Sequence, residues 1–155
     1  MATVKDMKAE PGVRVGVLDG SGGGSETREG GLTNAEIAAI HEFGTGTIPA
    51  RPFISASFEQ GKPGYINDLK KLLGAVFAGR LQVMQVFDIM GSRISTDIKK
   101  FVTAGDQVPP PNAESTRIRK EKKTKRGGVP GLVRTLVDTG QMINSVTWQV
   151  IRGDK

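Results

Sequence analysis

Apolar and polar residues alternate in two short stretches, one near each end of the chain. Every second residue of Val13–Leu18 is valine, and Val146–Val150 repeats this spacing with valine and tryptophan. A period of two is typical of a strand that buries one face. We therefore predict a strand in each stretch, and we expect the two strands to pair with each other.

A helix is predicted to begin at Leu32. Thr33 and Glu36 have the spacing of a capping box, in which each side chain accepts a hydrogen bond from the backbone N–H of the other. Gly44 is suited to end this helix in a left-handed conformation. The two prolines that follow favour extended backbone beyond it.

From Tyr65 to Val102 apolar residues recur at spacings of three and four, which predicts helix. Gly79 divides this pattern into Tyr65–Ala78 and Leu81–Val102, although one continuous helix has the same spacing. Gly91 costs about 1 kcal/mol of helix stability relative to alanine and indicates either close packing or a bend. The second helix carries an apolar stripe, expected to form core or a subunit contact, made of Phe87, Met90, Ile94, Ile98 and Phe101.

Two segments lack this periodicity. Residues 19–31 are rich in glycine and are expected to form a flexible loop. Residues 103–133 contain three consecutive prolines and a basic run and are expected to project as a loop, within which residues 113–123 can form a short helix. Asp138 is expected to cap a short helical turn that has Gln141 at its third position.

These elements predict one α+β domain over residues 1–155. A small antiparallel sheet of the N-terminal and C-terminal strands packs with two or three helices, one of them long. The 103–133 segment forms an extended arm.

The net charge of +6 is concentrated in one run. Its seven cations are Arg117, Arg119, Lys120, Lys122, Lys123, Lys125 and Arg126, and Glu121 is its one acid. Clustered cations can neutralise phosphates, and because no aromatic residue is interleaved, such binding should be independent of sequence. A solvated charged loop accounts for the run equally well.

Motifs that carry chemistry are incomplete in this chain. His41 is the only histidine, and Thr45 stands where a zinc-protease motif needs a second one. The GSGGGS run is followed by Glu26 and lacks the lysine of a phosphate-binding loop. There are no cysteines. We therefore expect no catalytic residue, no cofactor and no metal, and we expect that the protein is not an enzyme. A hydrolase that uses His41 and Glu42 is a weaker alternative.

No apolar run approaches the roughly 20 residues that span a bilayer. The charged N-terminus lacks the apolar segment of a secretory signal. We expect a protein that is made inside a cell and makes no membrane contact.

Two ordered runs carry a resemblance to a known family. Ala38, His41–Gly44 and Ile48–Phe53 fit the pattern Ala-x-x-His-Glu-Phe-Gly followed by Ile-Pro-Ala-Arg-Pro-Phe. Residues 138–146 fit Asp-Thr-Gly-Gln-Leu-x-x-Ser-Ile/Val, with Met142 in place of leucine, and Thr116–Lys120 resembles the basic stretch before it. The chain thereby resembles the tail-completion, or neck, proteins of long-tailed bacteriophages, also described as virion morphogenesis or minor tail proteins.

This resemblance implies a structural virion protein, assembled in the host cytoplasm, that forms a ring between the phage head connector and the tail. Such rings are typically hexameric, with DNA passing through the channel, and their partners are copies of the same chain, head-connector proteins and tail-terminator or tail-tube proteins. A ring needs heterologous contacts, and the expected contact residues are His41, Glu42, Phe43, Pro49, Arg51, Pro52 and Phe53. The basic run would face the DNA channel or an acidic partner. The alternatives are a tail terminator and a small nucleic-acid-binding module without sequence preference.

Overall fold

The computed structural model describes residues 11–18, 20, 24–25, 27, 31–104, 118, 121–122 and 140–153. Within them the elements follow the order β1 (Gly12–Val17), α1 (Asn34–Phe43), α2 (Phe53–Phe77), α3 (Val83–Thr103), α5 (Gln141–Asn144) and β2 (Val146–Ile151). The predicted α+β fold, with a small antiparallel sheet and a long helix, is confirmed. No helix among these residues has both the length and the apolar character needed to cross a membrane.

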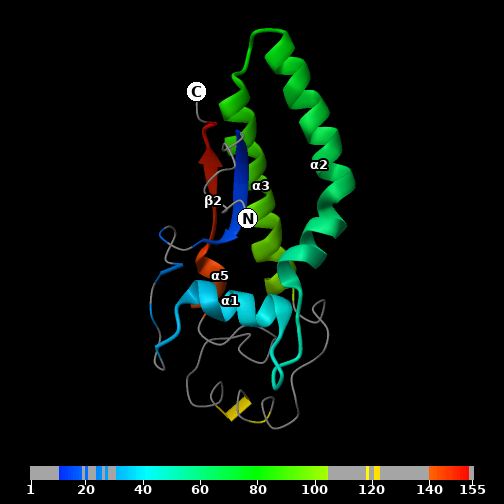
Figure 1. Ribbon diagram of the computed structural model, residues 1–155. Coiled ribbons are helices and arrows are strands. Elements are labelled where there is room, and N and C mark those ends of the chain that lie inside the picture. Colours follow the sequence, from blue (N-terminus) through cyan, green and yellow to red (C-terminus); the bar gives the residue numbers. More distant parts are fainter. Residues whose placement is uncertain are drawn as a thin grey trace, which may run out of the picture.

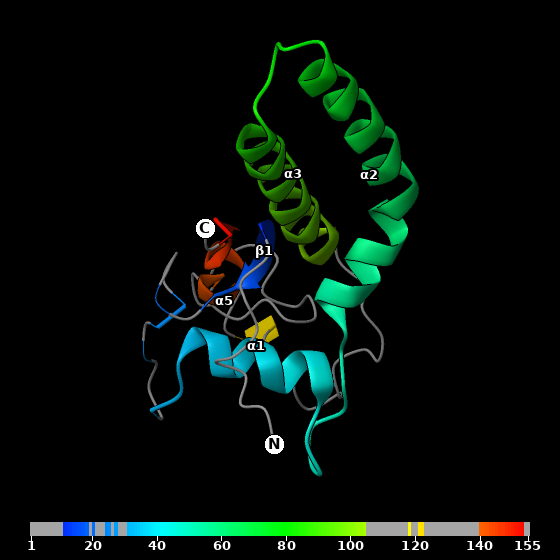
Figure 2. The same cartoon turned by 45° about the horizontal axis from the view of Figure 1, so that its top comes forward.

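The predicted strand pairing is confirmed. β1 and β2 are antiparallel, with Val13 opposite Val150 and Val17 opposite Val146. Figure 1 shows α3 between this sheet and α2, and Figure 2 shows the same order from a second direction. The α1 helix crosses the end of this stack, where it contacts α5.

The core forms around α3, whose apolar residues recur along the face turned toward the sheet and α2. The centre of the predicted stripe is correct, since Met90, Ile94 and Ile98 are buried. At its two ends the stripe differs from the prediction, because Val86 and Val102 are the fully buried residues there, and Phe87 and Phe101 are half-buried. The buried positions keep a spacing of four from Val86 to Val102, so the buried face winds slowly around a helix of 3.6 residues per turn.

Gly91 allows the sheet to approach α3 closely. A Cβ atom at this position would lie 2.5 Å from Cδ1 of Trp148 and 2.8 Å from a methyl carbon of Val13. The Trp148 indole crosses the helix at this glycine and its Nε1 donates a 2.8 Å hydrogen bond to Asp88. Of the two roles that the sequence left open for Gly91, close packing is the one observed.

The start of α2 corrects the prediction, which placed the helix at Tyr65. The helix begins at Phe53 and continues through Pro63, which cannot donate a backbone hydrogen bond. Both views show α2 changing direction along its length, as expected when a proline interrupts the hydrogen-bond ladder. Its end at Phe77 and the turn at Gly79, where φ is 70°, confirm two helices in place of one continuous helix.

The turn before β2 also differs from the prediction. α5 begins at Gln141, and its N-cap is Gly140 with a φ of 76°. Gln141 is therefore the first helical residue and not the third, and Asp138, which lies outside the described residues, is not the N-cap. Asn34 of α1 is buried and donates a 3.2 Å hydrogen bond to Ser145, so α1 is joined to the segment that enters β2.

Few residues of the two predicted loops are described. In the 19–31 segment, the Gly24 carbonyl accepts a 3.0 Å hydrogen bond from the Ala35 N–H, and Thr27 forms an isolated bridge with Thr33. In the 103–133 segment, Ile118, Glu121 and Lys122 are helical and exposed, within the range predicted for a short helix. The flexibility of the first segment and the projection of the second remain predictions.

Substitution of Gly91 by alanine is expected to destabilise the protein by about 1–3 kcal/mol, because the added methyl group overpacks the contact with Trp148. Gly74 of α2 is the matched control, since a Cβ there meets nothing within 4 Å. Gly74→Ala should stabilise by roughly 0.5–1 kcal/mol through helix propensity. Urea unfolding followed by circular dichroism measures both changes, and an equal gain in both variants would contradict the packing role of Gly91.

Candidate subunit interface

The run His41–Phe53 folds into a corner between the last turn of α1 and the first turn of α2. We call residues 41–55 the corner. The chain leaves α1, reverses, and returns so that the Arg51 N–H donates a 2.6 Å hydrogen bond to the His41 carbonyl. Within the loop, the Thr45 N–H donates to the Ile48 carbonyl at 2.8 Å and Thr45 Oγ1 accepts from the Ile48 N–H at 3.1 Å. The first bond closes the base of the loop, and the two bonds between Thr45 and Ile48 hold the backbone within it.

Glu42 connects the two helices of the corner. Its Oε2 accepts a 2.9 Å hydrogen bond from the Ile54 N–H, and its Oε1 accepts from the Ser55 N–H at 3.0 Å and from the Ser55 hydroxyl. The first amides of a helix have no partner within the helix, and an acid is favourable beside them. Pro52, the N-cap of α2, provides no side-chain acceptor, so Glu42 of the preceding helix satisfies these amides.

Gly44 makes the reversal possible. Its φ of 74° confirms the predicted glycine conformation in part, but its ψ of 179° lies outside the left-handed helical region. A Cβ at this position would lie 2.7 Å from the Ala50 nitrogen and 2.9 Å from the Ile48 carbonyl oxygen. Both the backbone angles and the lack of space therefore require glycine here.

The predicted interface residues fall into two groups. Glu42 and Phe53 are 7% and 0% exposed, so they belong to the interior of the subunit and hold the corner in place. Phe43 is 80% exposed. Pro49 and Pro52 are also exposed, and His41 and Arg51 are half-buried. The surface that the corner offers to another molecule therefore centres on Phe43 and the two prolines.

A second apolar surface was missed by the sequence analysis. It lies on the outer side of α2 and consists of Ile66, Leu69, Leu73 and Phe77, all at least 37% exposed and Phe77 89% exposed. We call these four residues the α2 stripe. Their spacing of three and four is visible in the sequence, where it predicts a helix without indicating which face is exposed. The face of α2 that packs into the core contains Tyr65, Leu72 and Val76, and the stripe adjoins it.

The basic run contributes one described cation, Lys122, which is exposed on a helical turn. The other six, Arg117, Arg119, Lys120, Lys123, Lys125 and Arg126, lie outside the described residues. Whether the run faces DNA or an acidic partner remains a prediction.

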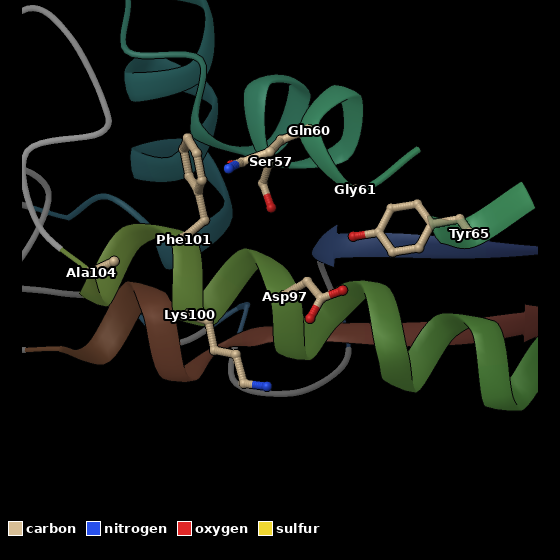
Figure 3. Close-up of a pocket in the computed structure, with 8 residues that line it drawn as sticks. All are labelled: Ser57, Gln60, Gly61, Tyr65, Asp97, Lys100, Phe101 and Ala104. Carbon is tan, nitrogen blue, oxygen red and sulfur yellow. The ribbon is translucent and has the colours of Figure 1, made fainter. Parts of the chain in front are cut away.

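A small cavity of about 270 Å³ lies between α2 and α3. Figure 3 shows the Tyr65 hydroxyl directed toward Ser57 and Asp97, while Lys100 points away. Tyr65 is 4% exposed, and its hydroxyl makes no hydrogen bond of good geometry to a described residue. Burial, together with the nearby Asp97 carboxylate, raises the pKa of Tyr65 to about 12.

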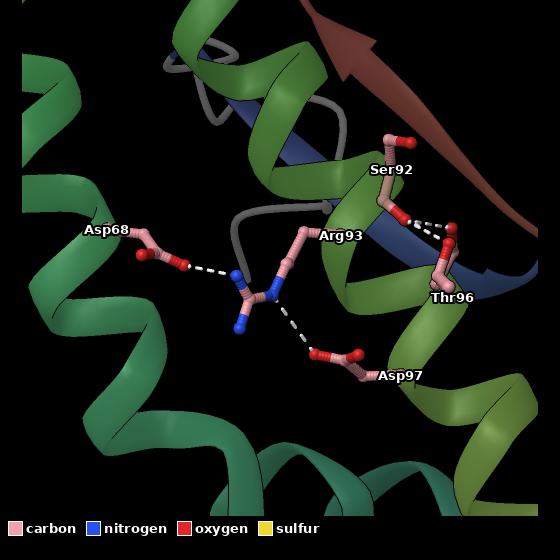
Figure 4. Close-up of polar contacts among 6 residues, drawn as sticks. Asp68, Ser92, Arg93, Thr96 and Asp97 are labelled. Carbon is pink, nitrogen blue, oxygen red and sulfur yellow. Dashed lines mark hydrogen bonds and ion pairs between the residues drawn. The ribbon is translucent and has the colours of Figure 1, made fainter.

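Above the cavity, Arg93 joins the two long helices. Its guanidinium lies 2.7 Å from Asp68 of α2 and 3.3 Å from Asp97 of its own helix (Figure 4). All three side chains are partly exposed, so each ion pair contributes at most about 1 kcal/mol. Among the described residues no three histidine, aspartate or glutamate side chains gather in a group able to hold a metal ion.

Comparison with known proteins adds no further identification: no protein-family model, no curated protein and no solved structure matches this chain.

Removal of the Glu42 carboxylate is expected to lower stability. Glu42→Ala leaves the Ile54 and Ser55 amides at a partly buried helix start without acceptors, at a cost of about 1–3 kcal/mol. Glu59→Ala is the control, because Glu59 forms only an exposed ion pair with Lys62, and its loss should change stability by less than about 0.5 kcal/mol. Equal unfolding midpoints for the two variants would refute the capping role.

The Tyr65 hydroxyl is expected to be dispensable at neutral pH. Tyr65→Phe removes a buried polar group that has no well-formed hydrogen bond, so stability near pH 7 should be unchanged or slightly higher. Because the folded pKa is near 12 and the ordinary value is 10.0, ionisation favours the unfolded chain as pH rises from 10 to 12. The wild type should therefore lose stability relative to Tyr65→Phe over this window. Parallel pH profiles of the two proteins would contradict this.

Proposed function

We propose that this protein is a structural subunit of a ring in the neck of a long-tailed bacteriophage, where it completes the tail and joins it to the head connector. The proposal rests on the resemblance of His41–Phe53 and residues 138–146 to the tail-completion proteins. The observation that supports it best is that Phe43 is 80% exposed on a corner whose backbone is held on both sides. An exposed aromatic residue on a fixed backbone is suited to a contact with another protein.

The distribution of apolar surface also supports a ring. The corner lies at the start of α2, and the α2 stripe extends to Phe77 at its end. A closed ring requires two different patches on each subunit, one for each neighbour. The corner, before and at the start of α2, and the α2 stripe, in its second half, are two such patches.

The corner is better suited to binding than to catalysis. The His41-Glu42 pair is the one place where the sequence suggests hydrolytic chemistry, but both oxygens of Glu42 accept hydrogen bonds from α2. A general base must be within reach of a proton on a substrate. The acid of this pair is engaged inside the subunit, which favours a structural role.

The basic run would supply positive charge along the DNA channel of the ring or toward an acidic partner ring. A small DNA-binding module is the second candidate, and only the concentration of seven cations in ten residues favours it. The two functions differ in the free subunit, because a DNA-binding module would bind DNA with an affinity that falls steeply with salt.

Phage particles produced without this protein are expected to contain complete heads and complete tails that are not joined. Supplying the wild-type chain should restore joined particles, and Phe43→Asp should fail to restore them because the exposed aromatic contact is lost. Lys71→Asp is the control, since Lys71 is exposed on α2 outside both apolar patches. Electron microscopy measures the fraction of joined particles obtained with each variant. Joined particles in the absence of the protein, or a single copy per particle, would overturn the proposal.

A further inference from the structure

The cavity between α2 and α3 is buried on its inner side and open on its outer side. Ser57 and Tyr65 line the inner side, and each is 4% exposed. Gln60 and Lys100 line the outer side and are exposed. The volume of about 270 Å³ is far above the roughly 10–15 Å³ that one water molecule needs, and below the roughly 300–1,000 Å³ of pockets for drug-sized ligands. The cavity therefore suits a small polar group.

The inner side carries a hydroxyl that the fold leaves unsatisfied. The Tyr65 hydroxyl is directed into the cavity (Figure 3) and makes no hydrogen bond of good geometry to a described residue. Gly61 allows this position, because a Cβ there would collide with the Tyr65 ring and hydroxyl. A buried hydroxyl without a partner is unfavourable. A bound group that forms a hydrogen bond with it would remove this cost.

Asp97 gives the cavity a negative charge. It is the one acid among the described residues that line the cavity. Arg93 contacts only its Oδ2 atom, at 3.3 Å (Figure 4), so the carboxylate can accept further hydrogen bonds. Lys100 is the one cation among the same lining residues, and its side chain points away from the cavity (Figure 3). This arrangement favours a cationic donor over an anion.

A guanidinium group fits the cavity better than a metal ion or an ammonium group does. One carboxylate is too few for a hard metal ion such as Ca²⁺, which takes about six to eight oxygen ligands. A guanidinium group is planar and has five N–H donors in a fixed arrangement, so it can donate to Asp97 and Tyr65 at the same time. Its flat face can also stack on the Phe101 ring, which lines the cavity. An ammonium group lacks this planar face.

We propose that this cavity binds a guanidinium group, which the Asp97 carboxylate holds by charge and which donates a hydrogen bond to the Tyr65 hydroxyl. Such a group belongs either to a free guanidino compound or to an arginine side chain of another protein molecule, and the chemistry of recognition is the same. The inference goes beyond the proposed function and does not depend on it, because the site is complete within one subunit.

The absorbance of the Tyr65 phenolate reports binding directly, because Tyr65 is the only tyrosine of the chain. Burial and the Asp97 carboxylate hold its pKa at about 12. Saturating methylguanidinium chloride should lower this pKa by about 1 unit, since a cation beside the oxygen favours the phenolate. The guanidinium group itself stays charged in this range. Sodium chloride at equal ionic strength is the control and should leave the pKa unchanged.

Calorimetric titration with methylguanidinium at pH 7 measures binding without alkaline conditions. Asp97→Asn should weaken binding by about tenfold or more, because it removes the charged acceptor. Asp68→Asn is the matched control. Asp68 pairs with the same Arg93, at 2.7 Å, but does not line the cavity, so this variant should bind within about twofold of the wild type. Tyr65→Phe keeps the ring and should weaken binding severalfold.

A dilution series distinguishes the two sources of the guanidinium group. If an arginine of a second copy fills the cavity, the Tyr65 pKa should fall as the protein concentration rises without added ligand, and Asp97→Asn should abolish this change. A pKa that is independent of protein concentration, together with binding of methylguanidinium, would assign the site to a guanidinium group from outside the chain.

Three results would overturn the proposal. The first is a lack of binding at pH 7 together with a Tyr65 pKa that neither methylguanidinium nor protein concentration changes. The second is an equal loss of affinity in Asp97→Asn and Asp68→Asn, which would show that the Arg93 ion pairs act on binding only through the packing of the helices. The third is binding of acetate in place of methylguanidinium, which would assign the cavity to anions through Lys100.

Discussion

The hydrogen bonds from the start of α2 to the Glu42 carboxylate are the interaction on which the arrangement of the helices depends. α2 begins directly after Pro52, which has no side chain able to cap it. The carboxylate that satisfies its amides comes from the last turn of α1, so the end of one helix determines where the next begins. This junction sets how α1 and α2 meet, whereas Asn34 at the other end of α1 joins that helix to Ser145 after α5.

The close approach of the sheet to α3 is a second constraint, and it is independent of the first. Trp148 reaches Asp88 only because Gly91 leaves room for its ring. The strand that carries Trp148 follows α5, which α1 holds through Asn34 and Ser145. The sheet is thus fixed at one end by α1 and along its length by α3. This accounts for the stability of the β1–β2 pair, since two strands paired in isolation would be only marginally stable.

Two kinds of feature were predicted correctly from the sequence. In one kind the interacting residues are close together in the sequence, and in the other the apolar residues recur at a regular spacing. The capping box of Thr33 and Glu36 is local, and both of its backbone hydrogen bonds are present. The alternation in β1 and β2 and the centre of the α3 stripe are likewise periodic. The start of α2 was missed because Gly61, Pro63 and Gly64 appear to end a helix when each is considered alone. Capping by Glu42 and packing around Tyr65 outweigh these unfavourable propensities, and both depend on the tertiary fold.

The candidate site was located by sequence, but the roles of its residues were not. His41-Glu42 attracts attention as a possible catalytic pair, and the same run was expected to contact a neighbour through all seven residues. In the fold, the burial of Glu42 and Phe53 assigns them to the support of the corner. Whether a side chain of the corner is buried depends on how α1 and α2 pack together. An irregular loop has no sequence periodicity from which this could be predicted. The α2 stripe was missed because a spacing of three and four predicts a helix but does not tell which of two adjoining apolar faces the rest of the fold covers.

A rigid corner would favour the proposed assembly, because association costs the conformational freedom of every side chain and loop that becomes ordered at the contact. In this protein the loop between α1 and α2 is already ordered by hydrogen bonds of its own, so Phe43 can be covered without a further cost for arranging the backbone. α2 has 25 residues and is therefore roughly 37 Å long. The corner lies at its start, and the α2 stripe occupies its second half, from Ile66 to Phe77. Two partners, one on each surface, would leave neither surface exposed, and identical partners placed in this way form a chain or a ring.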